Sequence, residues 1–281
     1  MASGKSILIT GCSSGIGKSA AYRLQERGYR VIASVRKPED IAVLKDEGLE
    51  HVIHLDLRSS GSIDTAIAET LKISGGQLYA LFNNGAYGQP GAVEDLTREA
   101  LVKQFQTNVF GTHELTVKIL PYLNKDDARI IQNSSILGFV AMPMRGAYNA
   151  SKHALEGLTD TLRIELRETN TKVSIIQPGP IQTHFRKNAL IALEENIDIT
   201  KSRHQGRYEG ALKRLKKVGA ASRFTLPPES VIEKLIHALE STRPKTRYKV
   251  TFPTYLLAFI KPLFSTNLFD KVLMASAKSE G

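Results

Sequence analysis

The sequence predicts a doubly wound α/β fold, in which helices cover both faces of a parallel sheet. From the start to about residue 180, short apolar runs rich in β-branched residues alternate with longer segments of helical periodicity, which is typical of βαβ units. A Gly-rich turn directly follows the first apolar run and precedes a helical segment. Right-handed crossovers would bring the carboxyl ends of the strands to one edge, where ligands bind in open α/β sheets.

The elements follow one another along the chain. Six strands are expected, in the apolar runs 5–10, 29–35, 51–57, 77–84, 128–135 and 172–179. The predicted helices are an amphipathic stretch ending at Arg27, a short helix before residue 51, and longer helices at about 61–74, 98–123 and 147–168. No repeat or obvious linker divides the chain. We therefore expect one Rossmann-type domain over residues 1–250, with a substrate loop at about 184–226, and a small helical, amphipathic C-terminal extension over 251–281.

Composition limits the classes of function. With 281 residues, 42% hydrophobic and 23% charged, the chain can bury a sizeable core. The single Cys12 excludes a disulfide framework and a cysteine-based zinc cluster, and no metal site is predicted. The N-terminal sequence MASGKSILIT leads directly into the first strand without the long apolar region of a signal peptide, so a reducing, cytoplasmic location is expected.

The net charge of +10 is compatible with a nucleic acid, an anionic cofactor or substrate, or an acidic membrane surface. Residues 201–217 hold seven Lys and Arg residues against one Glu. A solvated face or a flexible loop is favoured there over a specific anion site. Because no zinc-finger, homeodomain or RNP-type pattern accompanies this stretch, no nucleic-acid partner is expected.

The first turn reads TGCSSGIGKSA and carries Gly11, Gly15 and Gly17 between a strand and a helix. The first Gly allows a tight turn, and the others let the backbone approach a pyrophosphate at the helix N-terminus. The turn therefore predicts dinucleotide binding, and a purely structural turn is the alternative. Cys12 is interpreted as a small filler residue.

The end of the second strand indicates which dinucleotide binds. An NAD enzyme usually places a carboxylate about 20 residues beyond the Gly motif. Here Val35 stands near that position, followed by Arg36 and Lys37. A guanidinium pairs with a 2′-phosphate that a carboxylate would repel. The sequence therefore favours NADP over NAD, unless both cations are merely solvated.

The stretch GAYNASKHA places Tyr148 and Lys152 one helical turn apart, on the same face of the predicted helix. Ser135 ends the fifth strand 13 residues before Tyr148. A free Tyr hydroxyl has a pKa of about 10, and a nearby ammonium is expected to lower it. Tyr148 would then act as a general acid in carbonyl reduction and as a base in reverse, while Ser135 donates a hydrogen bond to the substrate oxygen.

These motifs, together with LDL (55–57), NNGA (83–86), Asn108, SSILG (134–138) and PGPIQT (178–183), occur in the order and spacing of the short-chain dehydrogenase/reductase family. The chain resembles that family over roughly residues 5–185. As a whole it looks like bacterial members described as NADP-linked aldehyde reductases, with relatives among retinol- and hydroxysteroid-type dehydrogenases. The resemblance implies an NADP(H)-dependent oxidoreductase that reduces aldehydes or ketones.

The resemblance also implies roles for individual residues. Tyr148 is the catalytic acid and base, Ser135 orients the substrate, and Lys152 binds the nicotinamide ribose and depresses the Tyr pKa. Asn108 holds a water in a proton relay to the Lys. Family spacing selects Ser135 over its neighbour Ser134. Cofactor contacts are implied, besides Tyr148 and Lys152, for Gly11, Ser13, Ser14, Gly15, Ile16, Gly17, Arg36, Lys37, Asp56, Leu57, Asn83, Gly85, Pro178, Gly179, Ile181 and Thr183.

One motif departs from the family. The usual Asn-Asn-Ala-Gly is here NNGA, with Gly85 and Ala86 exchanged. If the fourth position required a positive φ, Ala86 would be strained there. A local adjustment is expected.

The substrate end of the chain is less informative. Phe139, Met142, Met144 and Phe185 either line an apolar pocket or pack in the core. The tail YKVTFPTYLLAFIKPLFSTNLFDKVL alternates apolar residues with Lys. A cap over the active site or a dimer surface is favoured, and the alternative is an amphipathic surface that touches membrane and supplies lipophilic substrates. The resemblance implies a homodimer or homotetramer formed through the helices 98–123 and 147–168.

Two alternative functions stay open. The first is an NADP-linked alcohol dehydrogenase for retinol, hydroxysteroids or other lipids. The second is a regulatory protein that binds NADP(H) without catalysis, although such a protein would not need the four predicted catalytic residues.

Overall fold

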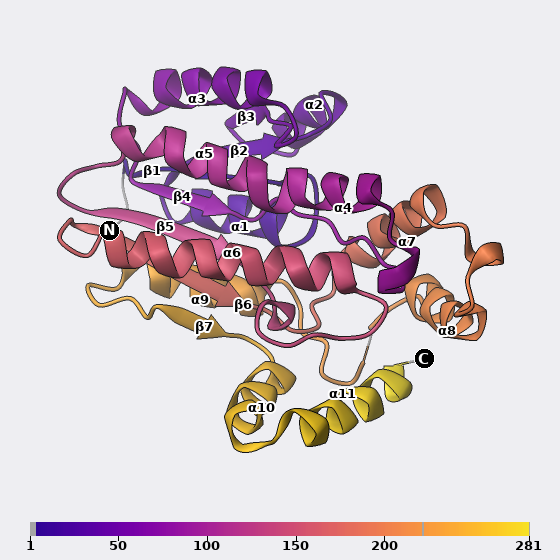
Figure 1. The fold of residues 1–281 in the computed structure, drawn as a ribbon. Coiled ribbons are helices and arrows are strands. Elements are labelled where there is room, and N and C mark those ends of the chain that lie inside the picture. Colours follow the sequence, from indigo (N-terminus) through magenta and orange to yellow (C-terminus); the bar gives the residue numbers. More distant parts are fainter. Residues whose placement is uncertain (1–3, 221, 281) are drawn as a thin grey trace.

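The computed structural model describes residues 4–220 and 222–280, and it confirms the predicted doubly wound α/β fold (Figure 1). Seven parallel strands form one sheet in the order β3-β2-β1-β4-β5-β6-β7. They are β1 Ser6–Ile9, β2 Arg30–Val35, β3 His51–His54, β4 Ala80–Asn83, β5 Ala128–Asn133, β6 Thr171–Gln177 and β7 Arg247–Lys249. The order reverses between β1 and β4, which creates the switch point where ligands bind in such sheets.

Helices cover both faces of the sheet. The α-helices of the described residues are α1 Gly15–Glu26, α2 Glu39–Asp46, α3 Ser60–Ser74, α4 Arg98–Phe105, α5 Thr112–Ile119, α6 Gly146–Glu165, α7 Phe185–Asn196, α8 Gln205–Lys216, α9 Glu229–Glu240, α10 Phe252–Ile260 and α11 Thr266–Glu280. Successive residues of β1 alternate between two cores: Ile7 packs in the cluster that includes α1 and α9, and Leu8 in the one that includes α3 and α5. This alternation is the pattern of a strand buried on both sides.

The differences between the structure and the predicted elements include the following three. The helix expected over 98–123 is interrupted by a π-helical turn, Gln106–Gly111, where a Cβ on Gly111 would collide with the Leu57 carbonyl. The strand β7 was not predicted, because its three residues are too few to show a period. Residues 201–217 are largely helical rather than a loop: α8 buries Tyr208 and leaves its cations at the surface.

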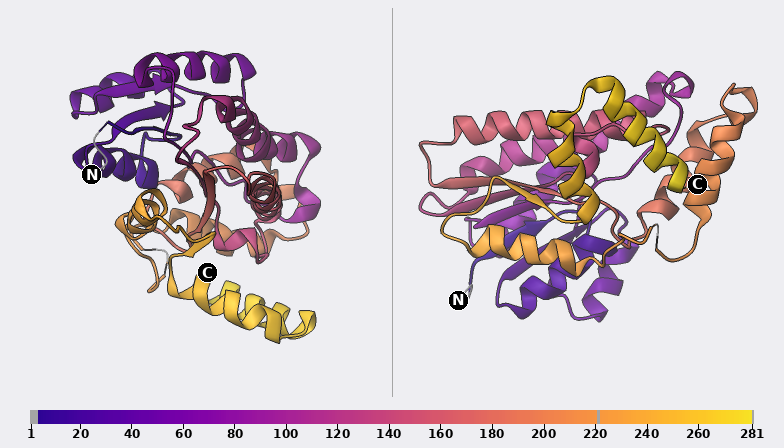
Figure 2. Two further views of the ribbon diagram at one scale, coloured as in Figure 1. Left: turned by 90° about the vertical axis from the view of Figure 1, so that its left-hand side faces the viewer. Right: turned by 90° about the horizontal axis from the view of Figure 1, so that it is seen from below.

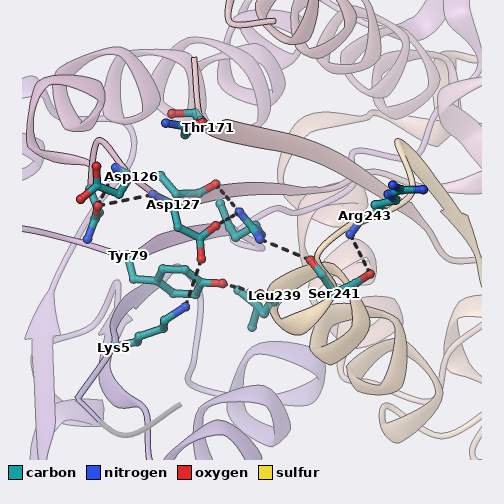
Figure 3. Close-up of polar contacts among 12 residues, drawn as sticks. Lys5, Tyr79, Asp126, Asp127, Thr171, Leu239, Ser241 and Arg243 are labelled. Atoms are coloured by element: carbon teal, nitrogen blue, oxygen red, sulfur yellow. Dashed lines mark hydrogen bonds and ion pairs between the residues drawn. The ribbon is translucent and has the colours of Figure 1, made fainter. Parts of the chain in front are cut away.

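The amino end of the sheet is held by a polar cluster (Figure 3). The Tyr79 hydroxyl donates to the carbonyl of Leu239 at the end of α9. The buried Arg129 pairs with Asp127 and donates to the Ser241 carbonyl at 3.3 Å. These contacts fasten α9 to the sheet at the end opposite to the predicted site.

The C-terminal helices α10 and α11 project from the underside of the molecule (Figure 2). Their inner faces pack against the segment that follows β5. Leu257, Phe269 and Leu273 of the helices lie in one apolar cluster with Leu137 and Val140 of that segment. Across residues 4–220 and 222–280, no helix is both long and apolar enough to cross a membrane.

Candidate active site

The turn after β1 has a shape that only glycine allows. Gly11 and Gly15 have φ values of 72° and 56°, in the left-handed region that glycine tolerates. A Cβ on Gly17 would collide with the Gly11 carbonyl oxygen, and a Cβ on Gly11 would lie 2.8 Å from the Cα of Gly85. The turn therefore closes tightly against the segment that follows β4.

The N-terminus of α1 fits an anionic group. Its N-cap residue Ser14 forms no side-chain cap hydrogen bond, and the first turn of the helix holds no acidic residue. Free N–H groups at such a terminus favour a phosphate. The Thr183 methyl lies 2.9 Å from where a Gly15 Cβ would be, so the segment after β6 reaches this turn. The residues present therefore fit the pyrophosphate of a dinucleotide, although the Ile16 side chain packs inward on the core.

Asn84, which sequence reasoning missed, joins the ends of three strands. The Thr10 hydroxyl accepts the N–H groups of Asn84 and Gly85 at 2.9 and 2.7 Å. The Asn84 amide donates to the Gly11 carbonyl at 3.2 Å and accepts from the Asn133 amide at 2.9 Å. Thus one side chain links β1, β4 and β5 at the carboxyl edge.

The two neighbouring positions of this motif behave differently. The buried Asn83 side chain donates to the Thr116 hydroxyl of α5 at 2.8 Å, so it points away from the Gly-rich turn. Among the described residues, Met144 is the one non-glycine residue with positive φ. Ala86 is therefore unstrained, and the exchange in NNGA carries no backbone cost at this position.

Ser135, Tyr148 and Lys152 meet at the carboxyl edge of the sheet. Ser135 follows β5 by two residues, and its hydroxyl accepts the Leu137 N–H at 3.1 Å. Tyr148 lies in the first turn of α6, and Lys152 lies one turn later. The Lys152 ammonium is buried, donates to the Asn133 carbonyl at 2.6 Å, and is 5.7 Å from the centroid of the Tyr148 ring.

The protonation properties of this trio differ from the expectation. Burial raises the pKa of Tyr148 to about 12, although the Ser135 hydroxyl and the charge of Arg145 oppose the rise. Burial lowers the pKa of Lys152 to about 8, and the Glu156 carboxylate opposes that shift. The ammonium is directed at the Asn133 carbonyl. The predicted depression of the Tyr148 pKa is therefore wrong for this arrangement, because burial of the phenol outweighs nearby charge.

A buried carboxylate lies behind the trio. Glu156 accepts hydrogen bonds from the Ser134 hydroxyl at 2.7 Å, from the Gln177 amide at 2.8 and 2.9 Å, and from Arg247 at 3.4 Å. Gly138 makes room for it, because a Cβ there would lie 2.5 Å from a Glu156 oxygen. The sequence signal was an acidic residue one turn beyond Lys152, which by itself looks like an ordinary helix residue.

Asn108 lies in the π-helical turn and is buried. Its amide donates to the Tyr87 carbonyl at 2.9 Å and to the Ser151 hydroxyl at 3.1 Å, and its oxygen accepts the Tyr87 N–H at 3.2 Å. Asn108 thus ties the loop after β4 to α6, next to Lys152. Such single π-turns occur frequently at functional sites.

The edge beside β2 and β3 is basic. Arg36 and Lys37 are exposed, and the Lys37 ammonium lies 3.9 Å from Glu39. Arg58, which the sequence reasoning did not select, holds the Asp56 carboxylate at 2.7 Å. This contact and, more weakly, the charge of Arg36 lower the pKa of Asp56. The Asp56 carboxylate is therefore already neutralised, whereas Arg36 is exposed and its charge is available to an anion.

The segment after β6 is held from both sides. The Pro178 carbonyl accepts the Ile136 N–H at 2.8 Å, next to Ser135. A Cβ on Gly179 would collide with the Thr251 hydroxyl, so only glycine fits there. Ile181 forms a β-bridge with Leu226. Leu57, at the other side of the site, is buried in the core beside α3.

Phe185, at the start of α7, covers Tyr148. The two rings meet edge to face, with centroids 5.3 Å apart and an angle of 63°. A Cβ on Gly88 would lie 2.6 Å from the Phe185 ring, so a side chain there would displace the ring. Met142 packs with α10 and α11, and Met144 packs with the cluster of α7 and α8. Of these predicted pocket residues, Phe185 is the one with a ring contact to Tyr148, the predicted proton donor.

Comparison with known proteins agrees with this geometry. A family model described as short chain dehydrogenase matches residues 5–193. The chain is 41% identical to the uncharacterized oxidoreductase YbbO of Escherichia coli (strain K12), covering 96% of this chain and 94% of that protein. It is 31% identical to the NADPH-dependent 3-dehydrocapnine reductase of Ornithobacterium rhinotracheale, covering 96% of each chain.

A further relative is the 3-ketodihydrosphingosine reductase of Bacteroides thetaiotaomicron, 32% identical over 87% of each chain. Among solved structures, a short chain dehydrogenase/reductase from Burkholderia phymatum in complex with NAD superposes with a TM-score of 0.77. It covers 92% of each chain at 23% identity.

Proposed function

The chain belongs to the short-chain dehydrogenase family, and on that premise we propose that it is an NADP(H)-dependent reductase of lipophilic aldehydes or ketones. The observation that carries the proposal is the meeting of Ser135, Tyr148 and Lys152 beside a Gly-rich turn that fits a pyrophosphate. When bound, a nicotinamide dinucleotide supplies the hydride. The product of reduction is an alcohol.

In this proposal Tyr148 donates a proton to the carbonyl oxygen as negative charge develops there. Its pKa of about 12 keeps the hydroxyl protonated at neutral pH, as a proton donor requires. Ser135 donates a hydrogen bond to the same oxygen. Lys152, with a pKa of about 8, is mostly a cation at pH 7, and in this proposal it binds the nicotinamide ribose.

The choice of NADP rests on the basic edge. Arg36 and Lys37 are exposed beyond β2, the Asp56 carboxylate is held by Arg58, and the exposed Glu39 lies 3.9 Å from the Lys37 ammonium. A 2′-phosphate would pair with the exposed Arg36 guanidinium at this edge. The name of one relative, an NADPH-dependent reductase, supports the same choice. The ratio of kcat/KM with NADPH to kcat/KM with NADH tests it, and a preference for NADH would refute it.

The substrate class rests on the apolar cover and on names of relatives. Phe185 closes over Tyr148, and two relatives are named as reductases of 3-dehydrocapnine and of 3-ketodihydrosphingosine. These names favour a lipid ketone as a second candidate beside aldehydes. An NADP-linked dehydrogenase of retinol, hydroxysteroids or other lipid alcohols would use the same residues in reverse.

Assembly and location complete the proposal. Exposed apolar side chains on the face formed by α4, α5 and α6, among them Phe110, Leu158 and Ile164, suit a homodimer or homotetramer. A cytoplasmic location fits the buried, free Cys12. The proposal also includes peripheral membrane contact through the C-terminal helices.

Tyr148→Phe is the decisive variant. Turnover of an aldehyde and ketone panel, followed by NADPH absorbance, is expected to fall at least about 1,000-fold, because the proton donor is lost. NADPH binding, measured by fluorescence, is expected to stay within about twofold of wild type. Unchanged turnover would refute the mechanism. A wild-type protein that binds NADPH but reduces no member of the panel would support a regulatory role instead.

A further inference from the structure

The outer face of α10 is an apolar stripe without a charged side chain. Its positions are spaced by three or four residues, so they lie on one side of the helix. The exposed fractions of the large side chains along it are Phe252 60%, Tyr255 52%, Leu256 43% and Phe259 69%, continued by Leu263 at 65%. The opposite side buries Thr254 and Leu257. A contiguous patch of this kind marks a binding surface rather than scattered exposure.

Cations precede and follow this stripe along the chain, and one cation lies beside it in space. Lys249 precedes α10 and Lys261 follows it, and residues 249–269 contain no Asp or Glu. Arg223 lies 4.7 Å from the centroid of the Phe224 ring, and that ring stacks on Phe252 at 5.3 Å. Lys271 adds an exposed cation on α11, beside Asp270. The surface thus combines an apolar stripe with the exposed Arg223 at the Phe252 end, and it has no carboxylate between residues 249 and 269.

The inner side of the same segment rests on the candidate active site. Leu257 packs in one cluster with Leu137, which follows Ser135, and Tyr148 packs against that cluster. The Lys261 ammonium donates to the Phe139 carbonyl in the same loop. Whatever binds the outer face of α10 is therefore one helix away from the site.

We propose that α10 docks the protein on the surface of a bilayer containing anionic lipid, so that membrane-dissolved carbonyl compounds reach the site. The substrate part of this inference rests on the proposed function. At 1.5 Å per residue, the nine residues of α10 span about 13 Å, far less than the roughly 30 Å of a hydrocarbon core. The helix therefore lies in the interface, where apolar side chains enter the bilayer and Lys or Arg meet anionic head groups.

A second copy of the chain fits this surface less well. A symmetric contact along the stripe would bring the cations beside it in one copy, such as Arg223, toward the same cations of the other, with no carboxylate between residues 249 and 269 to pair with them. The face of α4, α5 and α6 lies on another side of the molecule (Figure 1) and has its own exposed apolar residues. The two surfaces therefore suit different partners.

Vesicle sedimentation tests the docking. The full chain is expected to sediment with vesicles of phosphatidylcholine and phosphatidylglycerol, less with phosphatidylcholine alone, and less at high salt. The double variant Phe259→Ser, Leu263→Ser should bind about tenfold more weakly, because two inserted side chains are lost. Val43→Ser is the matched control, since Val43 is 53% exposed on α2, far from α10 in Figure 1, and it should bind like wild type. No sedimentation, or equal binding by the double variant, would overturn the proposal.

Two readouts separate docking from its alternatives. By light scattering the double variant should keep the wild-type mass, and a lower mass would assign the stripe to a second copy and overturn the proposal. Its kcat/KM should match wild type for a short, water-soluble aldehyde and fall about tenfold for a vesicle-dissolved one. If wild type binds vesicles but reduces no carbonyl compound, the docking stands and the proposed function fails.

Discussion

At the scale of single residues, Lys152 and Glu156 form a pair of buried, opposite charges one turn apart on α6. Burial alone would favour a neutral amine, and the Glu156 carboxylate opposes that shift. Glu156 is fixed in turn by Ser134, directly after β5, and by Gln177, the last residue of β6. The charge state of Lys152 therefore depends on contacts between elements that lie far apart in the sequence.

Glu156→Gln should change the pH dependence of the reaction. The Lys152 ammonium is present below its pKa of about 8 and is lost as the pH rises through that value. Removing the neighbouring negative charge lowers this pKa, so kcat/KM should begin to fall at a lower pH, by about one unit. The control is Glu165→Gln, at an exposed position of the same helix. An alkaline limb at the same pH in both variants would contradict the prediction.

Gly138→Ala tests the space around the same carboxylate. A Cβ there would lie 2.5 Å from the Glu156 oxygen and from the Ser134 hydroxyl, so the buried hydrogen bond must give way. We expect the free energy of unfolding, measured in urea, to fall by about 1–3 kcal/mol. Gly157→Ala, with nothing within 4 Å, should raise it by about 0.5–1 kcal/mol through helix propensity. Equal changes in the free energy of unfolding for the two variants would show that the space around Gly138 is not crowded.

Residues whose proximity follows from local spacing were predictable. Ser135, Tyr148 and Lys152 lie in two short segments with fixed separations, and the structure brings them together. Asn84 and Glu156 escaped prediction because their partners, Asn133 and Gln177, come from other elements. The pKa of Tyr148 was predicted with the wrong sign, because the extent of burial is a property of the folded chain.

At the scale of elements, α7 begins with the side chain that covers the reacting group. Phe185 meets the Tyr148 ring edge to face, and Gly88 leaves the room for it. The predicted loop at 184–226 is largely helical in the structure, with α7 and α8 packed together through Leu193 and Tyr208. The sequence pattern was weak there because α8 is amphipathic over only twelve residues.

Phe185→Ala should affect substrate binding more than stability. The side chain is 37% exposed, so the free energy of unfolding should change by less than about 1 kcal/mol. The KM of a lipophilic carbonyl compound should rise about tenfold, because the apolar contact over the reacting group is lost. Ile191→Ala, on the same helix and also exposed, should leave the KM unchanged. A loss of kcat with constant KM would instead assign Phe185 a role in chemistry.

The long predicted helix over 98–123 shows what periodicity misses. Its apolar spacing continues through α4 and α5, yet the chain inserts a π-helical turn at Gln106–Gly111. The turn places Asn108 against Tyr87 and Ser151. Its cause is tertiary, since Gly111 presses on the Leu57 carbonyl of another segment, and no local pattern encodes that contact.

At the scale of the whole molecule, the parallel sheet keeps the candidate active site at one edge and a cluster of structural contacts at the opposite edge. The carboxyl edge gathers the Gly-rich turn, Asn84 and the Ser135 loop, whereas the amino edge holds Tyr79 and Arg129 against the end of α9 (Figure 3). The alternation of elements predicted this sheet and its ligand edge. The strand β7 and the amino-edge cluster were not predictable, because both depend on where the chain returns after α9.

Tyr79→Phe should lower stability without changing catalysis. The hydroxyl donates to the Leu239 carbonyl, and both residues are buried, so its removal leaves an acceptor without its partner. We expect the free energy of unfolding in urea to fall by about 1–2 kcal/mol. Because the amino edge lies a full strand length from Tyr148, kcat and KM should equal those of wild type at a temperature where both proteins are folded. Tyr255→Phe, at an exposed position of α10, should change neither quantity. A Tyr79→Phe variant that loses activity while keeping its stability would show that the two edges of the sheet are coupled, and the separation of anchoring from chemistry would have to be abandoned.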